Sequence, residues 1–226
     1  AEARAARGVA VSFAGWLSTD GAQVIKAPNL GWGATDLCAV FAGYGLACHL
    51  ENDVDARAYG EWLAREPAAR GDLLTVNAGT GFALGMVING CVVRGARRRA
   101  GEIGHWRPGG VDEQCGCGDR GCLEAAVGGA ATSPEALLEP DRAEAWCGRV
   151  ADALAPVLSA LDPQNVLAVG GIFDARSDLR ERVAELLGER LPLRWAVPFV
   201  WTESAQGESA ARRGAIALAR RVQGDN

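Results

Sequence analysis

Residues 101–124 read GEIGHWRPGGVDEQCGCGDRGCLE and hold one histidine and three cysteines in a glycine-rich stretch. A structural Zn²⁺ takes four tetrahedral ligands from thiolate and imidazole groups, and neighbouring glycines let a chain turn tightly around an ion. We therefore predict that His105, Cys115, Cys117 and Cys122 bind one structural zinc ion. The alternative is a solvated histidine beside three unrelated thiols. A disulfide between Cys115 and Cys117 is disfavoured, because it would close a strained ring.

The segments on either side of this stretch alternate between strand and helix patterns. Short apolar or β-branched runs predict strands, and apolar residues at helical spacing with capping signals predict helices. The expected strands are 8–14, an edge strand ending at 24–25, 47–52, 73–78, 82–88, 91–93, 165–169 and 196–201, and the expected helices are 36–44, 54–64, 123–127, 142–161, 179–191 and 209–222. Because a strand directly follows Gly79, Thr80 and Gly81, these residues are expected in a hairpin turn. The pattern is that of an α/β protein.

Length, composition and charge narrow the class of protein. The 226 residues, 49% hydrophobic and 23% charged, suit a globular chain with one large lobe and part of a second around a shared cleft. The formal net charge of -5 argues against a general nucleic-acid surface. One local basic cluster, formed by Arg94, Arg97, Arg98 and Arg99, is either a solvated loop or an anion-binding site.

Targeting signals are not evident in the sequence. No run approaches the roughly 18 apolar residues of a membrane span, and the start AEARAARG lacks the apolar centre of a signal peptide. We expect a cytoplasmic protein without a membrane partner. In that reducing compartment Cys38, Cys48, Cys91 and Cys147 are expected to be buried small hydrophobic residues.

Six motifs together resemble one protein family. GEIGH and CGCGDRGCLE, at 101–105 and 115–124, accompany APNLGW at 27–32, ENDVDA at 51–56, NAGTG at 77–81 and AVGG at 168–171. This combination resembles the ROK family, named for repressors, open reading frames and kinases. The resemblance implies an α/β fold of the actin-like ATPase/hexokinase (ribonuclease H-like) type, with sugar and ATP held in a cleft between two lobes. It places the smaller N-terminal lobe, incomplete in this chain, at 1–63 plus 208–226, and the larger lobe with the sugar site and zinc loop at 64–207.

The resemblance also implies roles for individual residues. Asp53 would be the catalytic base that receives the proton of the attacking sugar hydroxyl. The sugar-binding residues would be Asn52, Asp53, Glu102, His105 and Glu124, and the phosphate- and nucleotide-binding residues would be Gly79, Thr80, Gly81, Gly170 and Gly171. Carboxylates and an amide suit sugar hydroxyls, which both donate and accept hydrogen bonds. A zinc-bound imidazole would keep its other N–H for a sugar oxygen.

The phosphate-binding half departs from the family pattern. The family's opening strand and DxGGT phosphate loop do not occur in this sequence, Ala83 stands where a further glycine is usual, and an arginine run at 97–99 replaces a glycine-rich spacer. Ala14 replaces the usual proline. Asp55 stands where asparagine is usual, and a like charge there would raise the pKa of Asp53.

Two functions from different classes follow from these observations. The first is an ATP-dependent kinase of a hexose or N-acetylhexosamine, which would use ATP with Mg²⁺ and Asp53 as the base. The alternative is a sugar-responsive transcriptional regulator of the same family whose helix-turn-helix would lie upstream, so that this chain itself binds no nucleic acid. A dinucleotide enzyme is disfavoured, because a strand and not a helix follows Gly79, Thr80 and Gly81. We favour the kinase and expect a homodimer.

Overall fold

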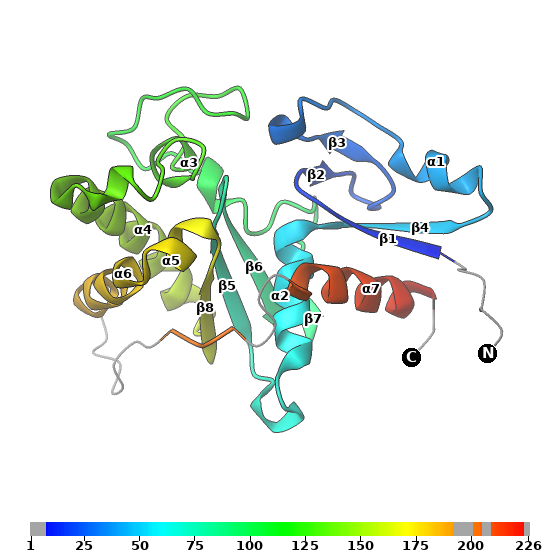
Figure 1. Cartoon of the computed structure of the whole chain (residues 1–226). Helices are drawn as coiled ribbons and strands as arrows, with labels where there is room; N and C mark the ends of the chain where they lie inside the picture. Colours follow the sequence, from blue (N-terminus) through cyan, green and yellow to red (C-terminus); the bar gives the residue numbers. More distant parts are fainter. Residues whose placement is uncertain (1–7, 192–200, 205–208, 224–226) are drawn as a thin grey trace. The chain divides into compact units, whose positions relative to one another are not determined.

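A computed structural model of the chain describes residues 8–191, 201–204 and 209–223 (Figure 1). The chain divides into two units: unit 1 consists of Ala1–Arg70, Gly85–Ala100 and Ala205–Asn226, and unit 2 of Gly71–Leu84 and Gly101–Ser204. Unit 1 is therefore discontinuous in sequence. The expected lobes, 1–63 plus 208–226 and 64–207, stay a prediction. The units differ from them by placing residues 64–70, 85–100 and 205–207 in unit 1.

Unit 1 is built on two small sheets. β1 (Gly8–Phe13) pairs in parallel with β4 (Ala47–Asn52), and β2 (Trp16–Leu17) pairs antiparallel with β3 (Val24–Lys26). The unit also contains α1 (Leu37–Ala42), α2 (Asp53–Ala64), α7 (Ala210–Gln223) and the short 3-10 helices Pro28–Leu30 and Pro67–Ala69. Its apolar core includes Phe13, Leu17, Val24, Ala27 and Leu50. This core holds the end of β4 in place, and Asp53, the predicted catalytic base, comes directly after that strand.

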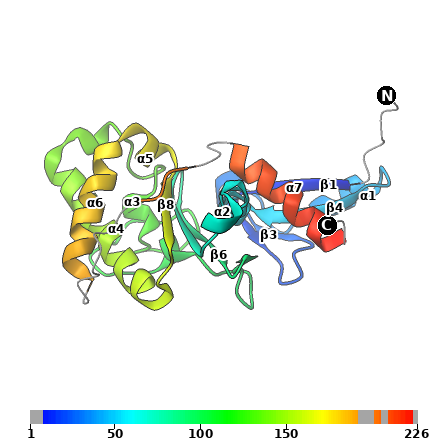
Figure 2. The same cartoon turned by 90° about the horizontal axis from the view of Figure 1, so that it is seen from below.

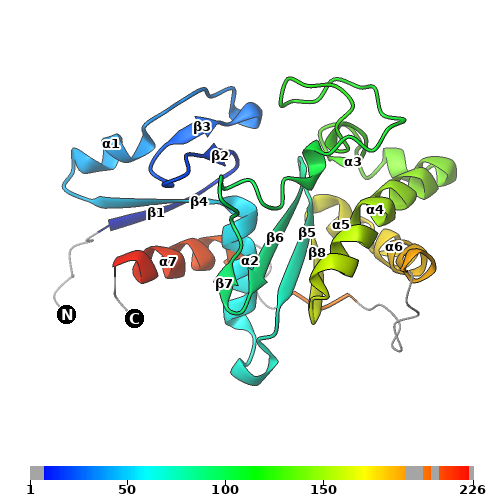
Figure 3. The same ribbon diagram turned by 180° about the vertical axis from the view of Figure 1, so that it is seen from behind.

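The main sheet has the strand order β7-β6-β5-β8 (Figure 3). β5 (Leu73–Ala78) and β8 (Asn165–Val169) are parallel and mostly buried, and β6 (Phe82–Ile88) runs antiparallel to β7 (Cys91–Val92). The helices of unit 2 are α3 (Glu124–Val127), α4 (Pro140–Leu161), α5 (Gly171–Ala175) and α6 (Ser177–Arg190), with 3-10 helices at Ile103–His105 and Ala136–Leu138. α4 packs beside α6. Residues 101–121 are irregular apart from the 3-10 turn Ile103–His105 and an isolated bridge between Gln114 and Arg120.

Helices α2 and α7 of unit 1 approach until their backbones touch (Figure 2). A Cβ added at Gly60 would overlap the carbonyl group of Ala210, and one added at Gly214 would overlap the carbonyl oxygen of Ala56. The Cβ added at Gly214 would also lie 2.8 Å from the backbone nitrogen of Gly60. Both positions therefore require a residue without a side chain.

The Gly214→Ala protein should lose more than about 3 kcal/mol of unfolding free energy, because the new methyl group meets backbone atoms that move only if a helix shifts. Gly188→Ala in α6 is the matched control, since nothing lies within 4 Å of a Cβ there. That change should stabilise the protein by roughly 0.5–1 kcal/mol, as alanine is the better helix former. Urea unfolding followed by circular dichroism measures both. Equal stability of Gly214→Ala and the parent would contradict the close helix approach.

Most expected strands and helices are present within the described residues, apart from small shifts at their ends. Strand β2 was not expected, and four further elements differ. α5 was not expected; it starts directly after Gly170, whose φ of 103° turns the chain out of β8. α4 begins earlier, at Pro140, because Glu139 accepts hydrogen bonds from the first helical N–H groups. α6 also begins earlier than expected, at Ser177. The expected strand 196–201 falls mostly outside the described residues, and Trp201 itself is not in a strand.

The expectation of buried free thiols was wrong for three of the four single cysteines. Cys38 of α1 and Cys48 of β4 form a disulfide, because packing of the helix on the strand brings their Cα atoms to 5.3 Å. Cys91 is exposed, since it lies on the short terminal strand β7, whereas Cys147 is buried as expected. Within the part of the chain that the structure describes, no helix is long and apolar enough to cross a membrane.

Candidate functional site

The loop between Glu102 and Leu123 brings four potential ligand atoms together in unit 2. Those of His105, Cys115, Cys117 and Cys122 all lie within 4.8 Å of one another. The Sγ of Cys115 is 3.7 Å from Nδ1 of His105, and the sulfur atoms of Cys117 and Cys122 are 3.8 Å apart. Tetrahedral zinc with bonds of 2.0–2.3 Å separates its ligands by about 3.5–3.8 Å. The side chains therefore fit a single tetrahedral metal ion.

Tight backbone turns create this arrangement. The N–H of Cys115 donates to the oxygen of Asp119 at 2.8 Å, and the N–H of Gly118 donates to the oxygen of Cys115 at 3.0 Å. Gly118 and Gly121 have φ values of 104° and 79°, a backbone region that favours glycine. Burial raises the pKa of the Cys115 thiol to about 12. A metal ion would compensate the charge of the thiolates and so displace their protons.

The second ring nitrogen of His105 faces Glu102. Its Nε2 atom lies 3.5 Å from Oε2 of Glu102, while Nδ1 faces the sulfur of Cys115. A carboxylate behind a metal-binding histidine fixes the tautomer and the ring orientation. The predicted sugar residues Glu102 and His105 are therefore neighbours in unit 2. Donation from this N–H to a sugar oxygen stays a prediction.

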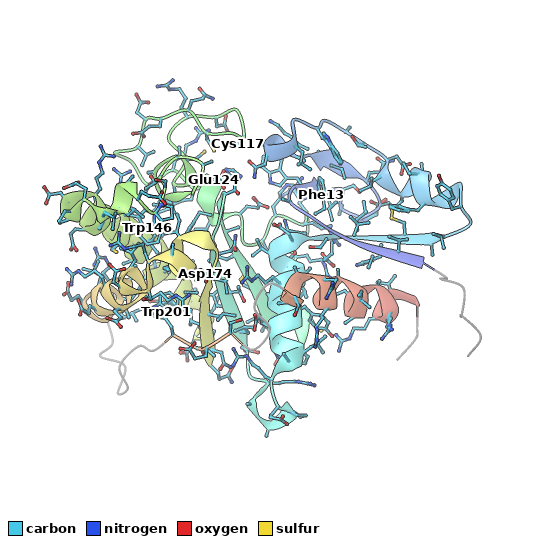
Figure 4. All side chains as sticks on the ribbon, viewed as in Figure 1. Phe13, Cys117, Glu124, Trp146, Asp174 and Trp201 are labelled. Atoms are coloured by element: carbon cyan, nitrogen blue, oxygen red, sulfur yellow. A yellow bond between two sulfur atoms is a disulfide. The ribbon has the colours of Figure 1, made fainter. Side chains whose placement is uncertain are left out.

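Glu124, the first residue of α3, connects the cysteine loop with the glycine hairpin. One carboxylate oxygen accepts the N–H of Phe82 at 3.0 Å, and the other lies 3.7 Å from the sulfur of Cys115. A Cβ at Gly81 would overlap the carboxylate. Figure 4 shows Cys117 in the loop and Glu124 at the start of α3. The predicted sugar residue Glu124 therefore has a structural contact that the sequence did not indicate.

The predicted phosphate and nucleotide residues also meet within unit 2. The oxygens of Gly79 and Thr80 accept the N–H groups of Gly129 and Ala130, at 2.8 and 2.9 Å. A Cβ at Gly170 would lie 2.8 Å from the nitrogen of Gly79. The hairpin 79–81 and the turn at Gly170 and Gly171 are thus adjacent, as two halves of one phosphate-binding surface would have to be.

Asn52 and Asp53 lie in unit 1, where β4 passes into α2. The side-chain oxygen of Asn52 caps the helix by accepting the N–H groups of Val54 and Asp55, at 2.9 and 3.1 Å. Burial raises the pKa of Asp53 above its usual value, while backbone hydrogen bonds and the charge of Arg57 lower it less. The sequence predicts that the charge of Asp55 raises the pKa of Asp53. The main cause is instead the burial of Asp53 itself, so the raised pKa does not depend on the second carboxylate.

Comparison with known proteins decides the family. The ROK family model matches residues 1–146. The chain belongs to the ROK family. A glucokinase of Streptomyces coelicolor is 34% identical over 143 residues, which is 60% of this chain and 44% of the relative. A xylose repressor of Caldicellulosiruptor bescii is 32% identical over 118 residues, 52% of this chain and 30% of the relative.

Solved structures show the fold of this ROK protein. A ROK family glucokinase from Streptomyces griseus in complex with glucose and AMPPNP superposes with a TM-score of 0.81 at 25% identity, over 97% of this chain and 83% of that one. The fold is therefore that of the actin-like ATPases, as predicted. The chain spans less than half the length of the two curated relatives named above. Both kinases and repressors occur among its relatives.

The sequence did not reveal the role of Glu51 in this ROK chain. Glu51 precedes Asn52 and Asp53 on β4, and its side chain is fully buried. Arg94 and Arg98 both bind its carboxylate. The basic cluster is therefore neither simply solvated nor a free anion site. A charged residue within a buried strand end was the signal that could have indicated an ion pair.

Proposed function

We propose that the chain is the zinc- and sugar-binding part of a ROK sugar kinase that transfers the γ-phosphoryl group of ATP to a hexose or N-acetylhexosamine. The half-buried Asp53 at the first turn of α2 carries this proposal. Its raised pKa suits a base that must accept a proton as a sugar hydroxyl oxygen bonds to phosphorus. The bond from the γ-phosphorus to the bridging oxygen then breaks and ADP leaves.

The metal is proposed to be Zn²⁺, because three thiols and one imidazole suit zinc better than the harder divalent cations. When bound, it would supply a structural cross-link and no reaction chemistry, since protein groups would fill all four positions. His105 would be held by the cysteine loop on one side and by Glu102 on the other. Glu102, His105 and Glu124 would then offer oriented acceptors and donors to sugar hydroxyls.

A sugar-responsive regulator is the second candidate. The similarity to a xylose repressor favours it, and so do the departures in the phosphate half, including Ala83 and the arginine run at 97–99. In that case the same carboxylates would bind sugar without turnover. ATP consumption in the presence of hexoses separates the two functions.

Glu102→Gln should weaken sugar binding by roughly tenfold to a hundredfold, because one sugar hydroxyl would lose its charged acceptor. Zinc content should stay near one per chain, because glutamine keeps an oxygen that can accept the second N–H of His105. Glu113→Gln is the control, since Glu113 is an exposed carboxylate of the same loop. Calorimetry with glucose, mannose and their N-acetylamino derivatives, together with metal analysis, tests this. Unchanged affinity in Glu102→Gln would place the sugar site elsewhere.

A further inference from the structure

Glu51 is the centre of an ion-pair network inside unit 1. Its two carboxylate oxygens accept from Nε of Arg94 at 3.1 and 3.2 Å, and Oε1 accepts from Nη2 of Arg98 at 2.8 Å. Nε2 of His49 is 3.4 Å from Oε2. Burial alone raises the pKa of Glu51, but the nearby His49 ring, the hydrogen bonds from Arg94 and the charges of Arg94 and Arg98 lower it to about 2. Glu51 is therefore a buried carboxylate that stays ionised.

Arg98 makes its contact from a backbone conformation that side chains rarely adopt. Its φ is 52°, in the left-handed region that favours glycine. Such an outlier persists only where surrounding interactions hold it. For Arg98 these include the bond to Glu51 and its closeness to the turn between β2 and β3. A Cβ added at Gly21 in that turn would lie 3.2 Å from the guanidinium. The pKa of Asp20 beside it is lowered by the hydrogen bond from Ser18, and the charge of Arg98 helps to lower it.

Arg99 binds the same hairpin from the neighbouring position. Its Nη1 donates to the carbonyl oxygen of Leu17 at 3.1 Å, and its guanidinium lies 5.2 Å from the ring centre of Trp16. Lys26, at the end of β3, also lies over the Trp16 ring, at 5.9 Å. The segment 94–99 thus joins the β2–β3 hairpin to the end of β4.

The hairpin continues directly into the motif at 27–32. Trp32 closes that segment by pairing with Ala27, and its ring stacks on Phe13 with centroids 5.9 Å apart. Phe13 lies opposite Asn52 in the register of β1 and β4. A shift of the hairpin would therefore move the 27–32 segment relative to Asn52 and Asp53.

We propose that Arg98 is a positioning residue: by joining the buried carboxylate of Glu51 to the Gly21 turn, it fixes the β2–β3 hairpin and the 27–32 segment beside Asn52 and Asp53 and so raises sugar affinity. The effect on sugar rests on the proposed function. The position of the hairpin itself does not. An anion site at Arg98 is disfavoured, because its guanidinium already binds a fully ionised carboxylate.

Arg98→Gln tests the proposal in the full protein, with Arg97→Gln as the control one residue away and exposed. Amide hydrogen exchange of residues 16–26 without sugar should become about tenfold faster in Arg98→Gln and stay at the parent rate in Arg97→Gln. The dissociation constants for glucose and N-acetylglucosamine should rise about tenfold. For a kinase, KM for sugar should rise while kcat stays within about twofold.

Arg98→Lys, which keeps the charge, should recover part of the exchange protection and affinity. Arg98→Gly, which relieves the backbone, is a second variant in case Arg98→Gln fails to fold, and it should match Arg98→Gln. Parent-like exchange in both charge-removing variants, or equal acceleration in Arg97→Gln, would overturn the proposal. Faster exchange with unchanged sugar affinity would overturn its sugar part. If the parent binds no sugar, the proposed function is wrong, and the exchange rates still decide whether Arg98 holds the hairpin.

Discussion

A Cys117→Ala protein should purify with far less than one zinc per chain, whereas the parent should carry one. Loss of one of four ligands should weaken zinc binding by more than about 100-fold, since even residues behind the ligands contribute 10–100-fold. The loop should then lose its order, because binding free energy of a structural metal is also folding free energy. Trypsin should cleave faster after Arg120, which is exposed on this loop and is followed by Gly121.

Cys147→Ala is the matched control for this experiment. It removes a buried thiol from α4 in the same unit without changing the four-ligand set. Its zinc content should equal that of the parent, and its loop should stay resistant to trypsin. A parent protein that contains well under one zinc and still has a protected loop would show that the cluster holds no structural metal.

Asp53→Asn should reduce phosphoryl transfer by about 10²–10⁴-fold in the complete protein while sugar affinity stays within about tenfold. Asparagine keeps the size and one acceptor oxygen of the side chain but cannot take up a proton. In the parent, turnover should fall as the pH drops through the pKa of Asp53, which burial places above the usual value near 4. ATP consumption and sugar binding, measured on the same proteins, test both expectations.

Asp36→Asn is the control for the change of charge. Asp36 is exposed and caps α1 by accepting the N–H of Ala39 at 3.0 Å, which asparagine does equally well. Its turnover should equal that of the parent. If Asp53→Asn keeps most of the rate, another group is the base. If the parent has no turnover but binds sugar, the regulator is favoured, and sugar-dependent release from DNA should survive the Asp53→Asn change.

The sequence predicted features whose residues lie close together along the chain. The metal cluster is such a case, because its ligands share one loop and zinc limits their types and number. Strands such as 73–78 and 165–169 were also predictable, since buried parallel strands are continuous apolar runs. ROK membership was predictable because the residues of its motifs, and the order of the motifs along the chain, are specific to the family.

Features that depend on distant residues were not predictable in this way. Glu51 and Arg98 are 47 positions apart, and no local pattern indicates which arginine meets which carboxylate. The bond from Phe82 to Glu124 spans 42 positions. The disulfide between Cys38 and Cys48 depends on how α1 packs on β4. Each arises from tertiary packing, which single-sequence patterns of spacing and composition do not contain.

The discontinuity of unit 1 has a consequence for biosynthesis. On the ribosome, α2 and the Asn52–Asp53 turn emerge early, but the helix whose Gly214 fits against Ala56 emerges only after all of unit 2. Unit 2 holds most of its strands and helices in one run of chain, so it can fold during translation. At that stage the side of α2 that carries Ala56 and Gly60 is still without its partner α7. We expect nascent chains in which α7 has not yet emerged to need chaperones and to be sensitive to proteases in unit 1. Sugar affinity should appear only after α7 has left the exit tunnel.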